Sequence, residues 1–347
     1  MQPFTISNPT MFTDGRITLD HGAGGTTMRR LIQDVFLKSF DNTDLAALND
    51  GAKLTLPSSR IVFTTDSYVV QPIIFPGGDL GKLAVCGTVN DLLVMGAKPR
   101  YLSLGMIIEE GLPIELLKQV IESIATTALS ANVAIVTGDT KVVPRGQCDQ
   151  LFINTAGIGT NPLGNGLSTQ PFETGDAIIV SGTLGDHAMA ILSARNGLTV
   201  SHSIESDCSP LVDLIDSMLS QHTGVKWMRD ATRGGVAAVL DELSSGFKCG
   251  IEIHEKRIPS ADATRAVCEL LGFDPIHLAN EGKIIAVVAQ DQAQAVLATM
   301  QATKHGAKAA IIGEVVGKDK SGVRVVTASG GTRKLQRPSG ELLPRIC

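Results

Sequence analysis

Residues 83–95 read LAVCGTVNDLLVM, an almost unbroken apolar run. With Leu80 and Gly96 at its flanks, the run predicts a buried helix over residues 80–96. Asp91 stands inside the run, and burying a carboxylate is costly unless a cation or hydrogen-bond donors neutralise it. The run therefore predicts a core helix that also carries a functional position.

Outward from this helix, the N-terminal half alternates strands and helices. Apolar spacing predicts a helix after Gly24-Gly25 and a surface helix over residues 113–129. The predicted strands cover residues 17–19, 61–65, 133–137 and 151–158. Asp66 follows the second of these strands and Asp139 the third, so both acids are expected at strand ends.

The second half repeats the mixture without regular βαβ order. Its predicted strands are 177–181, 283–289 and 310–316, and its predicted helices follow 185–187, begin near 232 and cover 292–301. Turn-forming residues make 159–166 the best linker. We expect two α/β sandwich domains: an N-terminal domain over 20–160 and a C-terminal domain over 161–338, with a lead at 1–19 and a tail at 339–347.

Composition narrows the function classes. The 347 residues carry a net charge of −5, which disfavours nucleic-acid binding. No apolar run is long enough to span a bilayer and no export signal is visible, so we expect a cytoplasmic protein without membrane contact. The six cysteines form no Cys-x-x-Cys pair, which argues against a zinc or redox motif.

Four aspartates are the main candidate metal ligands. Asp66, Asp91, Asp139 and Asp230 lack His or Cys partners nearby in sequence, and such oxygen donors suit Mg²⁺ with a phosphate ligand. Each acid alone is explained as well by a helix cap or turn. Asp91 is the exception, because the middle of a helix offers no capping role.

Other candidates are weaker taken one at a time. The glycine-rich run 21–25 can approach an anion or form a plain turn. Lys141 can bind a phosphate or an oxyanion, or be a solvated lysine. Glu281 can be a base or part of a turn, and His187 a helix-start donor or a base. Cys347 ends the chain, so its thiol can swing into a pocket or be presented to a partner.

Together these motifs resemble the HypE family of hydrogenase maturation factors, in the PurM-like (aminoimidazole ribonucleotide synthetase) superfamily. The similarity spans residues 20–347. The matching runs are HGAGG at 21–25, TDSYV at 65–69, CGTVNDL at 86–92, MGAKP at 95–99, TGDTKVV at 137–143, SGTLGDH at 181–187, MRDATRGG at 228–235, NEGK at 280–283 and PRIC at 344–347.

The resemblance implies a PurM-like fold and a homodimer that pairs through the N-terminal sheets, with ATP in a groove near that interface. It also implies ATP-dependent dehydration of a carbamoyl group on the Cys347 sulfur to a thiocyanate. A HypF-type carbamoyltransferase would supply the carbamoyl group. A HypC–HypD complex would receive the cyanide for the iron of a nickel–iron hydrogenase. A non-catalytic thiol carrier is the alternative.

The resemblance also assigns expected roles. Cys347, Lys141, Glu281 and His187 are the expected catalytic residues, with Glu281 preferred over His187 as the base. The four aspartates are expected to hold Mg²⁺. Nucleotide binding is expected from His21, Gly22, Gly24, Gly25, Asp66, Asn90, Asp91, Asp139, Thr140, Asp230 and Arg233. A selenophosphate synthetase would carry a reactive Cys in the glycine-rich loop, and a thiamine-phosphate kinase would leave Cys347 unexplained.

Overall fold

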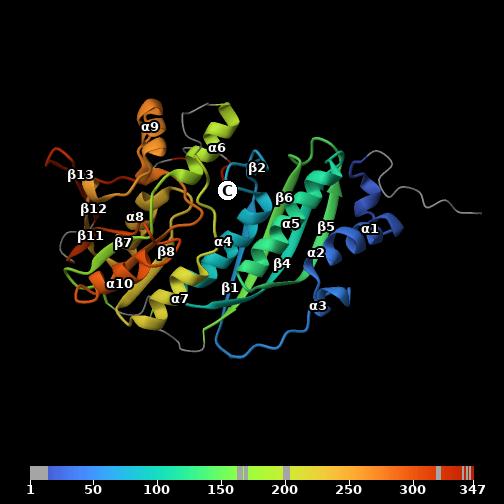
Figure 1. The fold of residues 1–347 in the computed structure, drawn as a ribbon, viewed down its shortest axis with the longest axis horizontal. Coiled ribbons are helices and arrows are strands. Elements are labelled where there is room, and N and C mark those ends of the chain that lie inside the picture. Colours follow the sequence, from blue (N-terminus) through green and yellow to red (C-terminus); the bar gives the residue numbers. More distant parts are fainter. Residues whose placement is uncertain are drawn as a thin grey trace, which may run out of the picture.

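The computed structural model describes residues 15–161, 167, 171–197, 204–317, 322–337, 340, 343 and 345–347. Within this part the chain forms two α/β domains side by side, and the C-terminus lies between them (Figure 1). Residues 1–14 of the expected lead, and most of the linker candidate after Asn161, lie outside the described residues. The two-domain α/β prediction is confirmed.

The N-terminal domain is built on a four-stranded sheet in the order β1-β6-β4-β5. These strands are β1 (Ile61–Tyr68), β6 (Leu151–Thr160), β4 (Lys98–Glu109) and β5 (Ala134–Val143). The β4–β5 pair is parallel and the other pairs are antiparallel. Helices α4 (Leu80–Val94) and α5 (Ile114–Ser130) cover one face (Figure 1).

Helix α4 is the predicted buried helix. Asp79 caps it by accepting a hydrogen bond from the Lys82 amide at 2.9 Å, and almost every residue from Leu80 to Val94 is buried. The helix contacts β1 and β6 of its own domain, and also β8 (Val225–Asp230) and α7 (Val212–Gln221) of the other domain. It is apolar on all sides because both domains pack against it.

The C-terminal domain has a seven-stranded sheet in the order β13-β12-β9-β11-β7-β10-β8. Alternate residues of its central strands enter two separate cores: Ile284 and Ala286 pack on one face, Ile285 and Val287 on the other. The further strands are β7 (Ala177–Val180), β9 (Gly250–His254), β10 (Ile284–Val288), β11 (Ala310–Gly317), β12 (Gly322–Val326) and β13 (Thr332–Lys334).

The remaining elements complete both layers. The C-terminal helices are α6 (Asp186–Asn196), α8 (Gly235–Phe247), α9 (Asp262–Leu271) and α10 (Ala293–Gln301), with short 3-10 turns Glu255–Arg257 and Pro275–His277. The N-terminal domain adds the hairpin β2 (Ile74–Phe75) and β3 (Gly78–Asp79), then α1 (Thr26–Leu31), a π-helical stretch Ile32–Leu37, α2 (Lys38–Phe40) and α3 (Thr43–Ala46).

Three sequence predictions need correction. Residues 17–19 form no strand: Arg16 makes an isolated bridge with Pro113, and a 3-10 helix occupies Leu19–Gly22. Asp66 and Asp139 lie inside β1 and β5 rather than at their ends, because both strands continue past the predicted boundary. β4 was not predicted at all, although it is central to the sheet.

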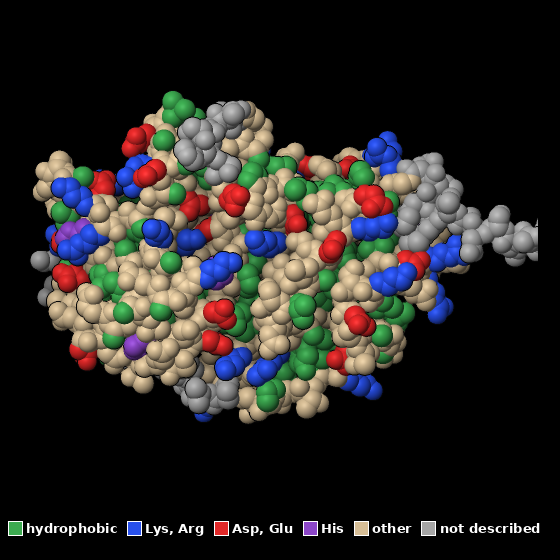
Figure 2. All heavy atoms as spheres, in the orientation of Figure 1, with side chains coloured by type: hydrophobic (Ala, Val, Ile, Leu, Met, Phe, Trp, Pro, Cys, Tyr) green, Lys and Arg blue, Asp and Glu red, His purple; other side chains and the backbone are tan. Residues whose placement is uncertain are grey.

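The charged side chains on the surface and the length of the helices bear on what the protein contacts. Acidic and basic side chains are intermingled over the viewed face (Figure 2). Within the described residues, no helix is long and apolar enough to cross a membrane.

Candidate active site between the domains

Three of the four predicted aspartates lie near one another where the domains meet. Asp91 on α4 accepts a hydrogen bond from the Thr64 hydroxyl of β1 at 2.9 Å. Asp66 lies two residues further along β1, on the same face of the strand as Thr64. Asp230 ends β8 of the other domain, and its carboxyl group interacts electrostatically with Asp91 and Asp66.

These carboxylates disfavour one another's ionisation. Burial and the neighbouring Asp91 raise the pKa of Asp230 to about 7. Burial likewise raises the pKa of Asp91, and Asp66 adds to the shift. Closely spaced acids with raised pKa values are typical of a cation site whose carboxylates are not yet neutralised by a bound cation. The donor set therefore fits a hard cation such as Mg²⁺.

The fourth aspartate does not join them. Asp139 pairs across the sheet with Gly105, then Asn154 and Ser67, so it shares a face with Ser67. Asp66 is the residue before Ser67 and points to the opposite face. Among the described residues, no group of three or more His, Cys, Asp or Glu side chains is close enough to hold a metal ion, so Asp66, Asp91 and Asp230 do not form a complete metal site by themselves.

Lys141 lies on the same face as Asp139. Its ammonium is 3.7 Å from the Asp139 carboxylate, and both side chains are about two-thirds exposed, at 66% and 65%. Thr140 between them is buried toward the helices. Both charged groups are accessible to a ligand on this face of the sheet.

The glycine-rich run packs beside these residues. A Cβ atom on Gly22 would come within 2.6 Å of the Val142 backbone nitrogen, so glycine is needed for this close approach to β5. His21 is buried, and its Nδ1 lies 3.0 Å from the Thr18 amide nitrogen. Gly24 and Gly25 precede α1, and a Cβ at either would meet open space. The run therefore places an open glycine loop next to Lys141.

Glu281 has the most perturbed environment of the predicted residues. Its side chain is only 3% exposed, and Oε1 has no hydrogen-bond partner among the described residues. Burial raises its pKa well above the ordinary value, and nearby Cys208 and Asp230 add to the shift. Burial of this kind favours the neutral form of the carboxyl group, which becomes a strong proton acceptor once it is ionised.

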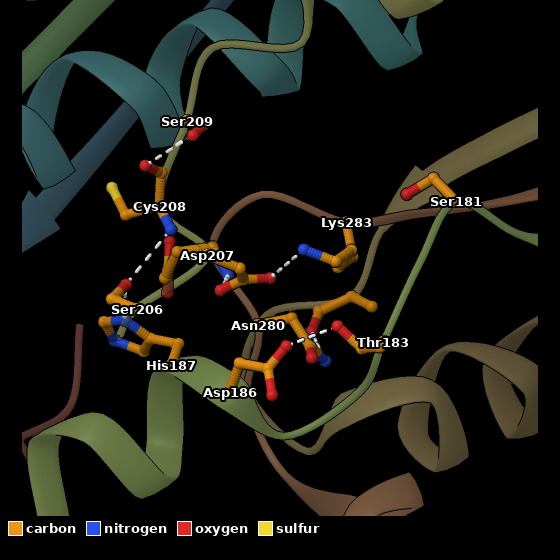
Figure 3. Close-up of polar contacts among 12 residues, drawn as sticks. Ser181, Thr183, Asp186, His187, Ser206, Asp207, Cys208, Ser209, Asn280 and Lys283 are labelled. Carbon is orange, nitrogen blue, oxygen red and sulfur yellow. Dashed lines mark hydrogen bonds and ion pairs between the residues drawn. The ribbon is translucent and has the colours of Figure 1, made fainter. Parts of the chain in front are cut away.

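The backbone around Glu281 is held by an ion pair that sequence analysis missed. Asp207 accepts hydrogen bonds from the Glu281 amide at 3.0 Å and the Lys283 ammonium at 2.9 Å (Figure 3). A Cβ atom on Gly282 would lie 1.9 Å from the Asp207 carbonyl oxygen, so no other residue fits there. The backbone of residues 280–283 is therefore held in place around Glu281.

Asn90 was expected to bind nucleotide, but its amide is already occupied. Its Nδ2 donates to the carbonyls of Ser209 at 3.1 Å and Glu281 at 3.3 Å, while its Oδ1 accepts from the Leu211 amide at 2.9 Å. These bonds tie α4 to the C-terminal domain. Arg233, also expected at the nucleotide, is exposed just before α8.

The C-terminal tail lies between the two domains and contacts both (Figure 1). Its last residues run alongside the segment after β1: the Val69 amide donates to the Cys347 carbonyl at 3.3 Å, and the Gln71 amide to the Arg345 carbonyl at 3.2 Å. Cys347 is half-buried. His187 contacts the carbonyl of Ile346 with its Nε2.

Arg345 contributes the strongest polar contacts of the tail. Its guanidinium pairs with Asp149 and donates to the Val69 carbonyl at 3.1 Å. Arg195 of α6 donates to the carbonyls of Arg345 and Gln71. Sequence analysis missed Asp149 and Arg195, because nothing in their local sequence marks them as partners of a tail some 150 or more residues away.

The comparisons with known proteins agree with this architecture. The AIR synthase related protein family matches through its N-terminal domain over residues 48–161 and its C-terminal domain over residues 173–326. The chain is 50% identical over 336 residues to the carbamoyl dehydratase HypE of Escherichia coli (strain K12), covering 95% of this chain and 99% of that protein.

Two solved structures extend the comparison. A hydrogenase maturation protein HypE in complex with ATP superposes with a TM-score of 0.91 at 44% identity, covering 95% of this chain and 99% of that one. A chain of a HypE–HypF complex superposes with a TM-score of 0.77 at 46% identity, covering 89% and 99%. This chain belongs to the carbamoyl dehydratase HypE family, within the AIR synthase related proteins.

Proposed function

We propose that this protein is an ATP-dependent carbamoyl dehydratase that acts on its own C-terminal cysteine. It removes water from a carbamoyl group on the Cys347 sulfur and leaves a thiocyanate there. The observation that carries the proposal is the docked tail, whose last residue lies between the two domains and contacts the segment after β1. Val69, whose amide donates to the Cys347 carbonyl, follows Asp66 by three residues in the sequence.

The chemistry requires the amide oxygen to leave. When ATP phosphorylates that oxygen, a new O–P bond forms to the γ-phosphorus. The bond between the γ-phosphorus and the oxygen that bridges it to the β-phosphorus breaks, and ADP is released. Loss of both nitrogen protons then forms the C≡N triple bond as the C–O bond breaks, and the oxygen departs with inorganic phosphate. The balance is one water removed from the thiocarboxamide for one ATP hydrolysed. The protein must therefore position a triphosphate and accept protons.

Glu281 is the proposed proton acceptor. Its pKa is raised, and its Oε1 has no hydrogen-bond partner among the described residues, which suits a base that takes a weakly acidic N–H proton. Lys141 is proposed to bind the γ-phosphate or polarise the carbonyl oxygen. The loop 21–25 covers the nucleotide from the side of β5.

Asp66, Asp91 and Asp230 are the proposed magnesium ligands. Mg²⁺ is usually held by one or two carboxylates together with substrate phosphates, so a cluster that is incomplete without nucleotide is consistent with this role. When bound, Mg²⁺ supplies charge neutralisation on the triphosphate during phosphoryl transfer. Asp139, on the other face of the sheet, is proposed to contribute to nucleotide binding from that face.

The proposed active form is a homodimer. The face of the N-terminal sheet away from α4 and α5 carries Ile61 and Phe63, which are 53% and 64% exposed. Exposed apolar side chains of this size on a sheet face favour contact with another protein surface. Pairing two such faces would also place Asp139 and Lys141 at the interface, beside the proposed nucleotide groove.

Two partners complete the proposed reaction sequence. A HypF-type carbamoyltransferase loads the Cys347 sulfur, in line with the solved HypE–HypF complex of a relative. A HypC–HypD complex accepts the cyano group on iron, for a nickel–iron hydrogenase. Both transfers require Cys347 to leave the groove, so the tail alternates between a docked and an extended position.

The test is a mass measurement on the C-terminal peptide. The protein is carbamoylated by the partner transferase, freed from it, and given Mg-ATP or a non-hydrolysable analogue. We expect the carbamoylated peptide to lose the mass of one water with Mg-ATP but not with the analogue. A Cys347→Ser variant should show no mass change at the carbamoylation step or at the ATP step. A carbamoylated tail that persists beside ATP, without ATP turnover, would identify a thiol carrier instead.

A further inference from the structure

The carbonyl of the last peptide bond is held by a side chain of the C-terminal domain. His187, the second residue of α6, directs Nε2 at the Ile346 carbonyl and has Nδ1 2.7 Å from the Ser206 hydroxyl. The ring is fully buried, and its edge lies against Phe75 of β2 with ring centroids 5.6 Å apart. His187 therefore touches the tail and both domains.

The neighbouring donors determine which ring nitrogen carries the proton. The Cys208 amide donates to the Ser206 hydroxyl oxygen at 3.0 Å (Figure 3). Ser206 still has its own hydroxyl hydrogen, and the acceptor available for it is His187 Nδ1. The hydrogen of the neutral ring is then on Nε2, where it donates to the Ile346 carbonyl. Burial lowers the pKa of His187 against the opposing charge of Asp207, which favours the neutral ring.

This arrangement leaves His187 no free lone pair to act as a base, because the lone pair on Nδ1 is occupied by Ser206. We propose that His187 is instead a positioning residue that seats the last peptide bond of the chain, with Ser206 selecting the tautomer that can donate to it. The inference rests on the proposed function, because seating matters for a tail that must leave and return.

The two half-reactions of Cys347 should respond in opposite directions when this contact is lost. Dehydration needs the docked tail, whereas loading by the transferase needs the extended one. One hydrogen bond to a buried carbonyl changes the ratio of docked to extended tail by about three- to tenfold. A general folding defect would slow both half-reactions, so the opposite signs identify positioning.

The experiment compares His187→Phe with His187→Gln in the full chain. Phenylalanine keeps the ring contact with Phe75 but has no donor, whereas glutamine can restore an N–H toward the carbonyl. Iodoacetamide labelling of Cys347, followed by peptide mass, reports the extended fraction without any catalysis. His222→Phe is the matched control, because His222 bonds Thr299 on another part of the domain.

We expect His187→Phe to label about three- to tenfold faster than the natural protein, to dehydrate a preloaded carbamoyl group correspondingly more slowly, and to accept carbamoyl from the transferase faster. His187→Gln should approach the natural values and His222→Phe should match them. Ser206→Ala, which keeps the ring, should shift labelling in the same direction as His187→Phe.

Unchanged labelling in both His187→Phe and Ser206→Ala would overturn the inference. Loss of both half-reactions with a lowered melting temperature in both variants would also overturn it, in favour of a purely structural role. If labelling shifts as expected but the natural protein dehydrates nothing, the seating role stands and the proposed function fails. The two proposals are therefore separable.

Discussion

Replacing Asn90 by alanine should destabilise the protein more than it weakens nucleotide binding. The side chain makes three hydrogen bonds between α4 and the C-terminal domain, to Ser209, Glu281 and Leu211. Each contributes about 1 kcal/mol net, and the buried partners would be left unsatisfied, so the loss is about 3 kcal/mol or more. For domains of this size that lowers the melting temperature by about 6–12 °C.

The single tryptophan gives a direct readout of this change. Trp227 is buried in β8, the strand that ends at Asp230, so its fluorescence reports loosening of the C-terminal domain. Asn196→Ala, at the exposed end of α6, is the matched control and should shift melting by less than about 2 °C. Normal melting of Asn90→Ala with strongly weakened ATP binding would refute the reasoning and restore Asn90 as a nucleotide ligand.

Three further predictions concern the site. Glu281→Gln should slow single-turnover dehydration by about a hundredfold or more while carbamoylation continues; an unchanged rate would exclude Glu281 as the base. Asp149→Asn should release Arg345 and speed alkylation of Cys347, measured by peptide mass, and an equal rate would mean that this ion pair does not hold the tail. Since the pKa of Asp230 is raised to about 7, protons compete with Mg²⁺ below that pH, so Mg²⁺ affinity measured by calorimetry should rise from pH 6 to 8; a flat profile would remove Asp230 from the ligands.

The sequence predicted elements well where a single core determines the pattern. The run 80–96 became α4 and the run 113–129 became α5, with boundaries close to those expected. β4 escaped prediction, although it pairs with two other strands. It starts with Lys98-Pro99-Arg100, which resembles a turn, and its strand character comes from its neighbours rather than from local alternation.

Prediction of the candidate site from the sequence was limited for a different reason. Local sequence singled out Asp66, Asp91 and Asp230, because acids beside apolar runs are conspicuous, and the structure brings these three near one another. Local sequence could not reveal that Asp139 faces away from them, since side-chain direction in a sheet depends on strand register, and a shift of one residue reverses it. The contacts of Asn90 were hidden for the same reason: its three partners lie more than a hundred residues away in sequence.

Both domains contribute contacts that hold the C-terminal tail. The position of Cys347 depends on backbone contacts made by Cys347 itself and by the residues just before it. The N-terminal domain supplies a backbone edge at Val69 and Gln71, and the C-terminal domain supplies Arg195 and His187. Because the carbonyls and amides of the tail backbone make many of these bonds, the docked pose is compatible with different groups on the Cys347 sulfur. In the proposed function, the same contacts can receive the tail before dehydration and release it afterwards.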